Sequence, residues 1–128
     1  MHSAEQDLAD PGADRPLDWT YKGLPQARLG KTRHDIAALR LQLFTADVLF
    51  PIAVLREDIL LDNSAWMTRY LQGRDVAFAP HGKTTMSPEL MRLQLHDGAW
   101  ALTAATAHHV RAYRQWGARR IFMANQLV

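Results

Sequence analysis

Lys83 is the residue of this chain best suited to covalent chemistry. It lies in the segment Pro80-His81-Gly82-Lys83-Thr84-Thr85, which directly follows the apolar run at residues 76–79. A primary amine can attack a carbonyl carbon and form a Schiff base, whereas a guanidinium stays protonated and cannot. Besides Lys83 the chain has only Lys22 and Lys31, so most of its basic side chains are arginines. Lys83 is therefore the candidate nucleophile.

Two kinds of ligand would explain a Gly-Lys-Thr sequence after a strand. In a P-loop the lysine reaches nucleotide phosphates, but that fingerprint needs a glycine five residues before Gly82, where Ala77 stands. The sequence Gly30-Lys31-Thr32 fails similarly, because Pro25 occupies the glycine position. The other ligand is a carbonyl cofactor, since burial disfavours the charged amine and the neutral amine condenses with an aldehyde. Pyridoxal 5′-phosphate (PLP) suits such a lysine, and a nucleotide-binding P-loop module stays the alternative.

Composition limits the other classes of function. With 128 residues, 48% of them hydrophobic and 22% charged, the chain has the size and composition of one globular domain. The formal charge is only +2 and no Lys/Arg run forms a stripe, so we expect no nucleic-acid partner. The absence of cysteine excludes disulfides, thiolate catalysis and cysteine zinc sites. No run approaches the ~20 apolar residues of a membrane span, so we expect a cytoplasmic protein without a membrane partner.

Apolar runs and helical patterns alternate along the chain. Strands are predicted as continuous apolar runs at residues 50–55, 76–79, 100–105 and 121–124. Helices are predicted by three- and four-residue apolar spacing at residues 33–43, 58–71, 88–96 and 107–116. Continuous apolar strands are typical of parallel sheets covered on both faces. The helix at residues 88–96 has a start signal in Ser87 and Pro88.

This alternation predicts an α/β fold, either a doubly wound sheet or a (β/α)8 barrel. In both folds the chemistry lies at the carboxyl ends of the strands, which are followed here by Lys83, Thr106 and Asn125-Gln126. A barrel needs ~250 residues, so we expect the first three βα units of a partial barrel in an N-terminal fragment. We divide the chain into a disordered lead at residues 1–16, an irregular or helical segment at residues 17–47, and the barrel part at residues 48–128.

Several short segments together resemble the D-serine dehydratase and D-threonine aldolase family, and most closely its amino acid deaminase branch. The resemblance covers roughly residues 48–128, and its most specific part is the Pro-His-x-Lys-Thr element after a strand. The matching segments are Phe50-Pro51-Ile52-Ala53-Val54, Asn63, the run from Pro80 to Pro88, Gln94-Leu95, Gly98-Ala99-Trp100, Ala105-Thr106 and Ala124-Asn125-Gln126-Leu127-Val128. These enzymes are fold-type III PLP enzymes with an alanine-racemase-like barrel.

The resemblance implies a PLP-dependent lyase that removes ammonia from a β-hydroxy D-amino acid such as D-serine or D-threonine. Lys83 matches the lysine that forms the internal aldimine and takes part in α-proton chemistry. His81 and Thr84 match flanking residues that shape the cofactor pocket, and Gly82 permits close approach. Contacts to the cofactor or the substrate are also expected at Thr106, Asn125 and Gln126. For Asn125 and Gln126 the alternative is a simple turn.

The resembling enzymes are far longer than this chain. Their later strands supply the phosphate loop and the partner of the pyridine nitrogen, and in several members a further domain supplies ligands for a divalent metal. None of these parts is present here, so we expect the fragment alone to be inactive. The complete protein is compatible with a homodimer. The alternatives are D-threonine aldolase, a racemase of the same fold type, and a non-catalytic PLP carrier.

Two other groups of residues have plainer interpretations. The side chains of His108 and His109 are about 100° apart on a helix, so they cannot chelate as a pair, and we assign no metal ligand. Trp66, Met67 and Tyr70 have the spacing of a core-facing stripe. We expect these three side chains to pack in the core.

Overall fold

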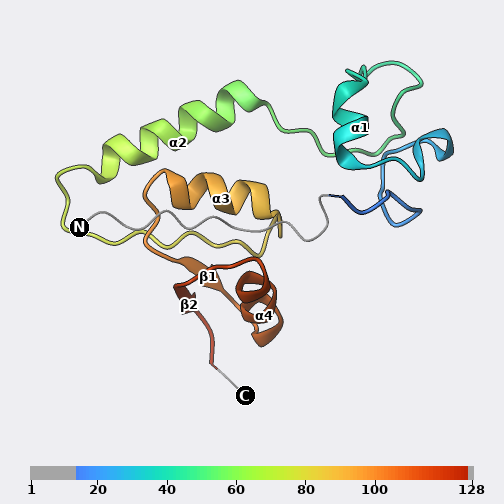
Figure 1. Ribbon diagram of the computed structural model, residues 1–128. Helices are drawn as coiled ribbons and strands as arrows, with labels where there is room; N and C mark the ends of the chain where they lie inside the picture. Colours follow the sequence, from blue (N-terminus) through green and yellow to red (C-terminus); the bar gives the residue numbers. More distant parts are fainter. Residues whose placement is uncertain (1–13, 127–128) are drawn as a thin grey trace. The chain divides into compact units, whose positions relative to one another are not determined.

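The structure, a computed structural model, describes residues 14–126 (Figure 1). The chain divides after Leu55 into two compact units, which we call the first unit, residues 14–55, and the second unit, residues 56–126. Most of the lead predicted at residues 1–16 lies outside the described residues. Each unit is described separately.

The first unit is built from short helices and turns. It contains the 3₁₀ helix η1 (Gln26–Arg28) and the helix α1 (Arg33–Ala38). Thr32 and Asp35 form a capping box at the start of α1, in which each side chain accepts a hydrogen bond from the other's backbone N–H. The predicted helix at residues 33–43 is therefore shorter than expected. Arg40, with φ of 50°, has left-handed backbone that cannot continue it.

The strand predicted at residues 50–55 is wrong. These residues are outside every strand and helix of the structure, and Val54 and Leu55 are 56% and 65% exposed. A strand is stabilised by backbone pairing with a neighbour, and no described strand pairs with this segment. The apolar run predicts a strand, but its side chains are exposed apart from the partly buried Ile52.

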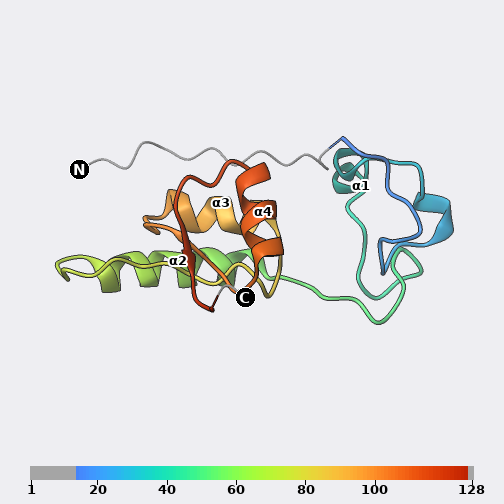
Figure 2. The same ribbon diagram turned by 90° about the horizontal axis from the view of Figure 1, so that it is seen from below.

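The second unit is a mixed α/β structure. It contains α2 (Glu57–Leu71), α3 (Pro88–His96), β1 (Leu102–Ala104), α4 (Ala107–Gln115) and β2 (Ile121–Met123). The two strands are parallel, and α4 packs beside them in the connection (Figure 1 and Figure 2). The three predicted helices and two of the predicted strands are confirmed within a few residues of their expected ends.

The third expected strand of this unit, at residues 76–79, is only partly formed. The chain is extended there, and we call residues 78–82 the motif segment. It lies parallel to β1 through a bridge between His81 and Thr103. The Thr103 N–H donates to the Pro80 carbonyl at 2.8 Å, and the Gly82 N–H donates to the Thr103 carbonyl at 3.3 Å. The motif segment, β1 and β2 are thus three adjacent parallel segments, although only two of them are full strands.

The core of the second unit lies between α3, β1 and α4. Its largest fully buried side chains are Tyr113, Met91 and Leu102. Local signals mark both ends of α3. The Ser87 side chain accepts a hydrogen bond from the Leu90 N–H at its start, as predicted, and Gly98, with φ of 106°, follows its end.

The carboxylate of Asp47 holds the loop that follows α1. It accepts hydrogen bonds from the Gln42 N–H at 3.2 Å, the Thr45 hydroxyl at 2.9 Å and the Arg28 guanidinium at 3.3 Å. These donors, first of all the Gln42 N–H, stabilise the ionised form and lower the pKa of Asp47 below its usual value of 3.8.

We expect this loop to loosen in acid. A pKa that is lower in the folded state gives a stabilisation that is present above the unfolded value and is lost as the pH falls through the folded value. Amide hydrogen exchange at Gln42, corrected for intrinsic rates, should therefore accelerate below pH 3.8. Asp47→Asn should remove this pH dependence. The same acid response in the Asn variant would show that another group is responsible.

Candidate functional site at the carboxyl ends of three parallel segments

A polar residue lies close after the end of each of the three parallel segments. Lys83 follows the motif segment, Thr106 follows β1 after one residue, and Asn125 follows β2 after one residue. Because the segments are parallel, their carboxyl ends meet at one side of the sheet, which we call the carboxyl edge. The Asn125 side-chain amide donates to the Ala105 carbonyl at 3.5 Å, so Asn125 reaches from β2 to the end of β1.

Lys83 begins a turn at residues 83–85 on this edge. The turn is closed by a hydrogen bond from the Met86 N–H to the Gly82 carbonyl at 3.0 Å. Lys83, His81 and Thr84 are all exposed. The burial of the Lys83 amine that the sequence predicts is therefore wrong for the described residues. No described element covers this edge, so the amine is open to solvent.

Gly82 is buried, like Pro80, and its neighbours require a glycine. A Cβ atom at this position would lie 2.4 Å from Met91 Cε and 2.7 Å from Tyr113 Oη. Contacts this short do not occur for real Cβ atoms, so any other residue would displace its neighbours. The expected close approach at Gly82 thus has a structural reason: the backbone lies directly on the side chains of α3 and α4.

The remaining predicted site residues have backbone roles in the structure. The Thr106 side chain caps α4 by accepting from the His109 N–H at 3.2 Å. The His109 Nδ1 accepts from the Ala105 N–H at 3.3 Å, which holds the His109 ring near the end of β1. The Gln126 N–H donates to the Asn125 side chain at 2.9 Å. Among residues 14–126 no group of three or more His, Asp or Glu side chains could hold a metal ion.

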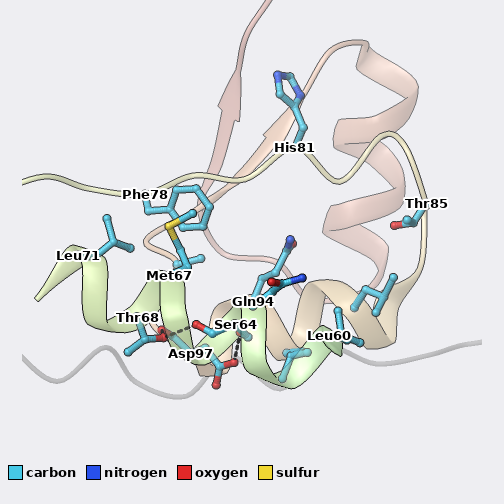
Figure 3. Close-up of a pocket in the computed structure, with 14 residues that line it drawn as sticks. Leu60, Ser64, Met67, Thr68, Leu71, Phe78, His81, Thr85, Gln94 and Asp97 are labelled. Atoms are coloured by element: carbon cyan, nitrogen blue, oxygen red, sulfur yellow. Dashed lines mark hydrogen bonds between the residues drawn. The ribbon is translucent and has the colours of Figure 1, made fainter. Parts of the chain in front are cut away.

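A cavity of about 270 Å³ lies between α2, α3 and the chain around the motif segment (Figure 3). Most of its wall is apolar. His81 and Thr85, which lie two residues before and after Lys83 in the sequence, are at its border. Lys83 does not line it. The lining residues are Leu60, Asn63, Ser64, Met67, Thr68, Leu71, Phe78, His81, Thr85, Leu90, Leu93, Gln94, Asp97 and Ala99.

The cavity could not be predicted from the spacing of Trp66, Met67 and Tyr70, which is typical of a stripe that faces the core. Met67 does face inward and lines the cavity, but Trp66 and Tyr70 are 55% and 47% exposed. Their rings stack on each other at 5.3 Å between centroids. The polar residues Ser64 and Thr68, on the same face as Met67, were the available signal that this face is not purely core.

A small polar cluster joins α2 to the end of α3 at one side of the cavity (Figure 3). The Ser64 hydroxyl donates to the Asp97 carboxylate, and the Thr68 hydroxyl donates to the Asp97 carbonyl at 3.0 Å. Thr68 also donates to the Ser64 carbonyl at 3.1 Å. Asp97 therefore connects the two helices that form the cavity.

Comparisons with known proteins add no assignment. No family model matches the chain, and a search of curated proteins found no match. Every helix in the described part of the chain is too short or too polar to cross a bilayer.

We expect Asp97→Ala to loosen α2. The variant removes the acceptor of the Ser64 hydroxyl in a partly buried site, which should lower the free energy of unfolding by about 1–2 kcal/mol. Urea unfolding followed by circular dichroism measures the loss, and amide exchange should locate it in α2. Asp62→Ala, an exposed position on the same helix, is the control. Equal stability of the two variants would contradict a joining role for Asp97.

Proposed function

We propose that this chain bears the cofactor lysine of a PLP-dependent lyase that acts on D-amino acids, and that Lys83 is the attachment residue. One observation supports this proposal most strongly. The parallel pairing of the motif segment with β1 brings Lys83 to the same edge as Thr106 and Asn125. An amine, a hydroxyl and an amide at one edge of the sheet are suitable groups for an aldehyde cofactor and the amino acid it processes.

The residues present fit the aldehyde end of the cofactor. The Lys83 amine is exposed, so an aldehyde can reach it. The backbone of the preceding residue, Gly82, is packed closely against its neighbours. Thr106 and Asn125 are the residues that would contact the cofactor or the substrate. When bound, PLP supplies an electron sink for negative charge at the α-carbon of an amino acid.

The part of this chain in the reaction follows from the chemistry of Lys83. After a substrate amine replaces it, the free Lys83 Nζ is a base that can accept the α-proton. Loss of the β-hydroxyl as water would leave an enamine, and hydrolysis of its imine tautomer by a water molecule would give pyruvate and ammonia from D-serine. Such a site must exclude water, and we propose that a complete (β/α)8 barrel, of which these parallel segments form a part, covers the carboxyl edge.

A PLP carrier without catalysis is the second candidate, and the exposure of Lys83 favours it. A carrier needs only an accessible amine, whereas a lyase needs an enclosed one. The two candidates share the attachment residue and differ in turnover. Attachment and turnover are therefore tested separately.

We expect PLP to label Lys83. The chain is mixed with PLP, reduced with borohydride and digested, and the modified peptide is mapped by mass spectrometry. Lys83→Arg keeps the positive charge but cannot condense with an aldehyde, so it should lose the adduct, while Lys22→Arg and Lys31→Arg should retain it. Preferential labelling of Lys22 or Lys31 in the unaltered chain would refute the assignment. Thermal protection by ATP instead of PLP would favour the P-loop alternative.

We expect the 128-residue polypeptide to show no steady production of pyruvate from D-serine, even with Lys83 loaded. Its carboxyl edge is open to water, and the exposed Lys83 has no enclosure in which to accept a proton selectively. A coupled lactate dehydrogenase assay measures pyruvate, with Lys83→Arg as the blank. Steady turnover above this blank would show that the open edge is sufficient for catalysis.

A further inference from the structure

Tyr113 on α4 is a fully buried residue that the proposed function does not use. Its exposed fraction is 0%, and its hydroxyl has no hydrogen-bond partner in the described part of the chain. A buried hydroxyl without a partner is destabilising, and phenylalanine would fill nearly the same space without this cost. The hydroxyl therefore needs an explanation.

The position of the hydroxyl supplies one. Tyr113 Oη and Cζ would lie 2.7 Å and 3.0 Å from a Cβ atom built on Gly82. The end of the Tyr113 side chain thus lies directly against the backbone of the residue that precedes Lys83. It occupies the space that a side chain at Gly82 would need.

The Tyr113 ring is itself held firmly in place. It is stacked on the His109 ring, with ring centroids 6.2 Å apart and an angle of 11° between the planes. The centroid of the Trp116 ring lies 5.8 Å from that of Tyr113. His109 is in turn held by its hydrogen bond from the Ala105 N–H at the end of β1. The contact with Gly82 is therefore made by a side chain that the sheet and α4 keep in position.

Gly82 connects the contact with Tyr113 to the backbone position of Lys83. Its N–H donates to Thr103 of β1, and its carbonyl accepts from the Met86 N–H, which closes the turn at residues 83–85. With β1 on one side and Tyr113 beneath, the start of the turn has little freedom to move. Lys83 is the first residue of that turn.

We propose that Tyr113 is a positioning residue for the turn that bears Lys83, acting through contact of its hydroxyl end with Gly82. The inference rests on the proposed function for the importance of Lys83. The contact itself is a property of this chain and can be measured without a cofactor.

The test uses the full chain and three variants: Gly82→Ala, Tyr113→Phe, and both together. The first readout is amide hydrogen exchange at Met86, which reports closure of the turn. The second is the rate of PLP adduct formation at Lys83, trapped with borohydride. Melting temperatures show which variants are folded.

Gly82→Ala should displace the turn, because the new methyl group meets Tyr113 Oη and Met91 Cε. We expect Met86 exchange to be at least about tenfold faster and adduct formation about tenfold slower, since small displacements of a reacting group reduce rates strongly. Tyr113→Phe should melt no lower than the original chain. In the double variant, removal of the hydroxyl relieves the 2.7 Å contact, and the flexible end of Met91 can move aside. The ring carbon Cζ stays 3.0 Å from the methyl group, so both readouts should recover in part.

A double variant that is as perturbed as Gly82→Ala in Met86 exchange would overturn the proposal. Recovery of the melting temperature and of Met86 exchange without recovery of the Lys83 rate would also overturn it, because Tyr113 would then have only a structural role. Failure of the original chain to form any adduct at Lys83 would refute the proposed function instead. In that case Met86 exchange still decides whether Tyr113 positions the turn.

Discussion

The pairing of Thr103 with the motif segment is the interaction on which the rest of the site depends. Thr103 is buried in the middle of β1, and its N–H and carbonyl bond to Pro80 and Gly82 on one side. Its hydroxyl adds a bond to the Ala79 carbonyl. A single residue thus makes three hydrogen bonds to the segment that leads into Lys83. These three bonds fix the segment before Lys83 relative to the end of β1.

The parallel direction of this pairing gives the site its chemical character. Parallel segments end at the same side of a sheet, and polar residues that follow them gather there although they are distant in the sequence. In this chain those residues are an amine, a hydroxyl and an amide. Close packing beneath Gly82 adds a second constraint, because the backbone before Lys83 lies on α4 as well as beside β1. The backbone at Lys83 is held while its side chain is exposed.

Features that depend on neighbouring residues were predictable from the sequence. The start of α3 follows from Ser87 and Pro88, and its end lies just before Gly98, because capping and left-handed backbone are local properties. The strand expected at residues 50–55 was wrong because strand formation depends on residues that are distant in the sequence. Its apolar residues satisfy a strand pattern, but a strand also needs a partner, and no local pattern reveals whether one is present.

The same distinction applies to the candidate site. The position of Lys83 directly after an extended segment could be inferred, since it depends on sequence order and on parallel direction. Its exposure could not, because exposure depends on which elements cover the carboxyl edge. The contact of Tyr113 with Gly82 was also hidden, since the two residues are distant in the chain and only the packing of α4 brings them together. The cavity beside α2 likewise results from how two helices pack.

The most direct test of the account is to locate a trapped cofactor in the folded chain. In the borohydride-reduced PLP adduct, nuclear Overhauser effects can be measured between the protein and the C6 proton and 2-methyl protons of the pyridine ring. We predict contacts from the pyridine ring to Thr106 and Asn125, with the adduct on Lys83. A ring that shows no contact with either residue, although Lys83 is modified, would contradict a cofactor site at the carboxyl edge.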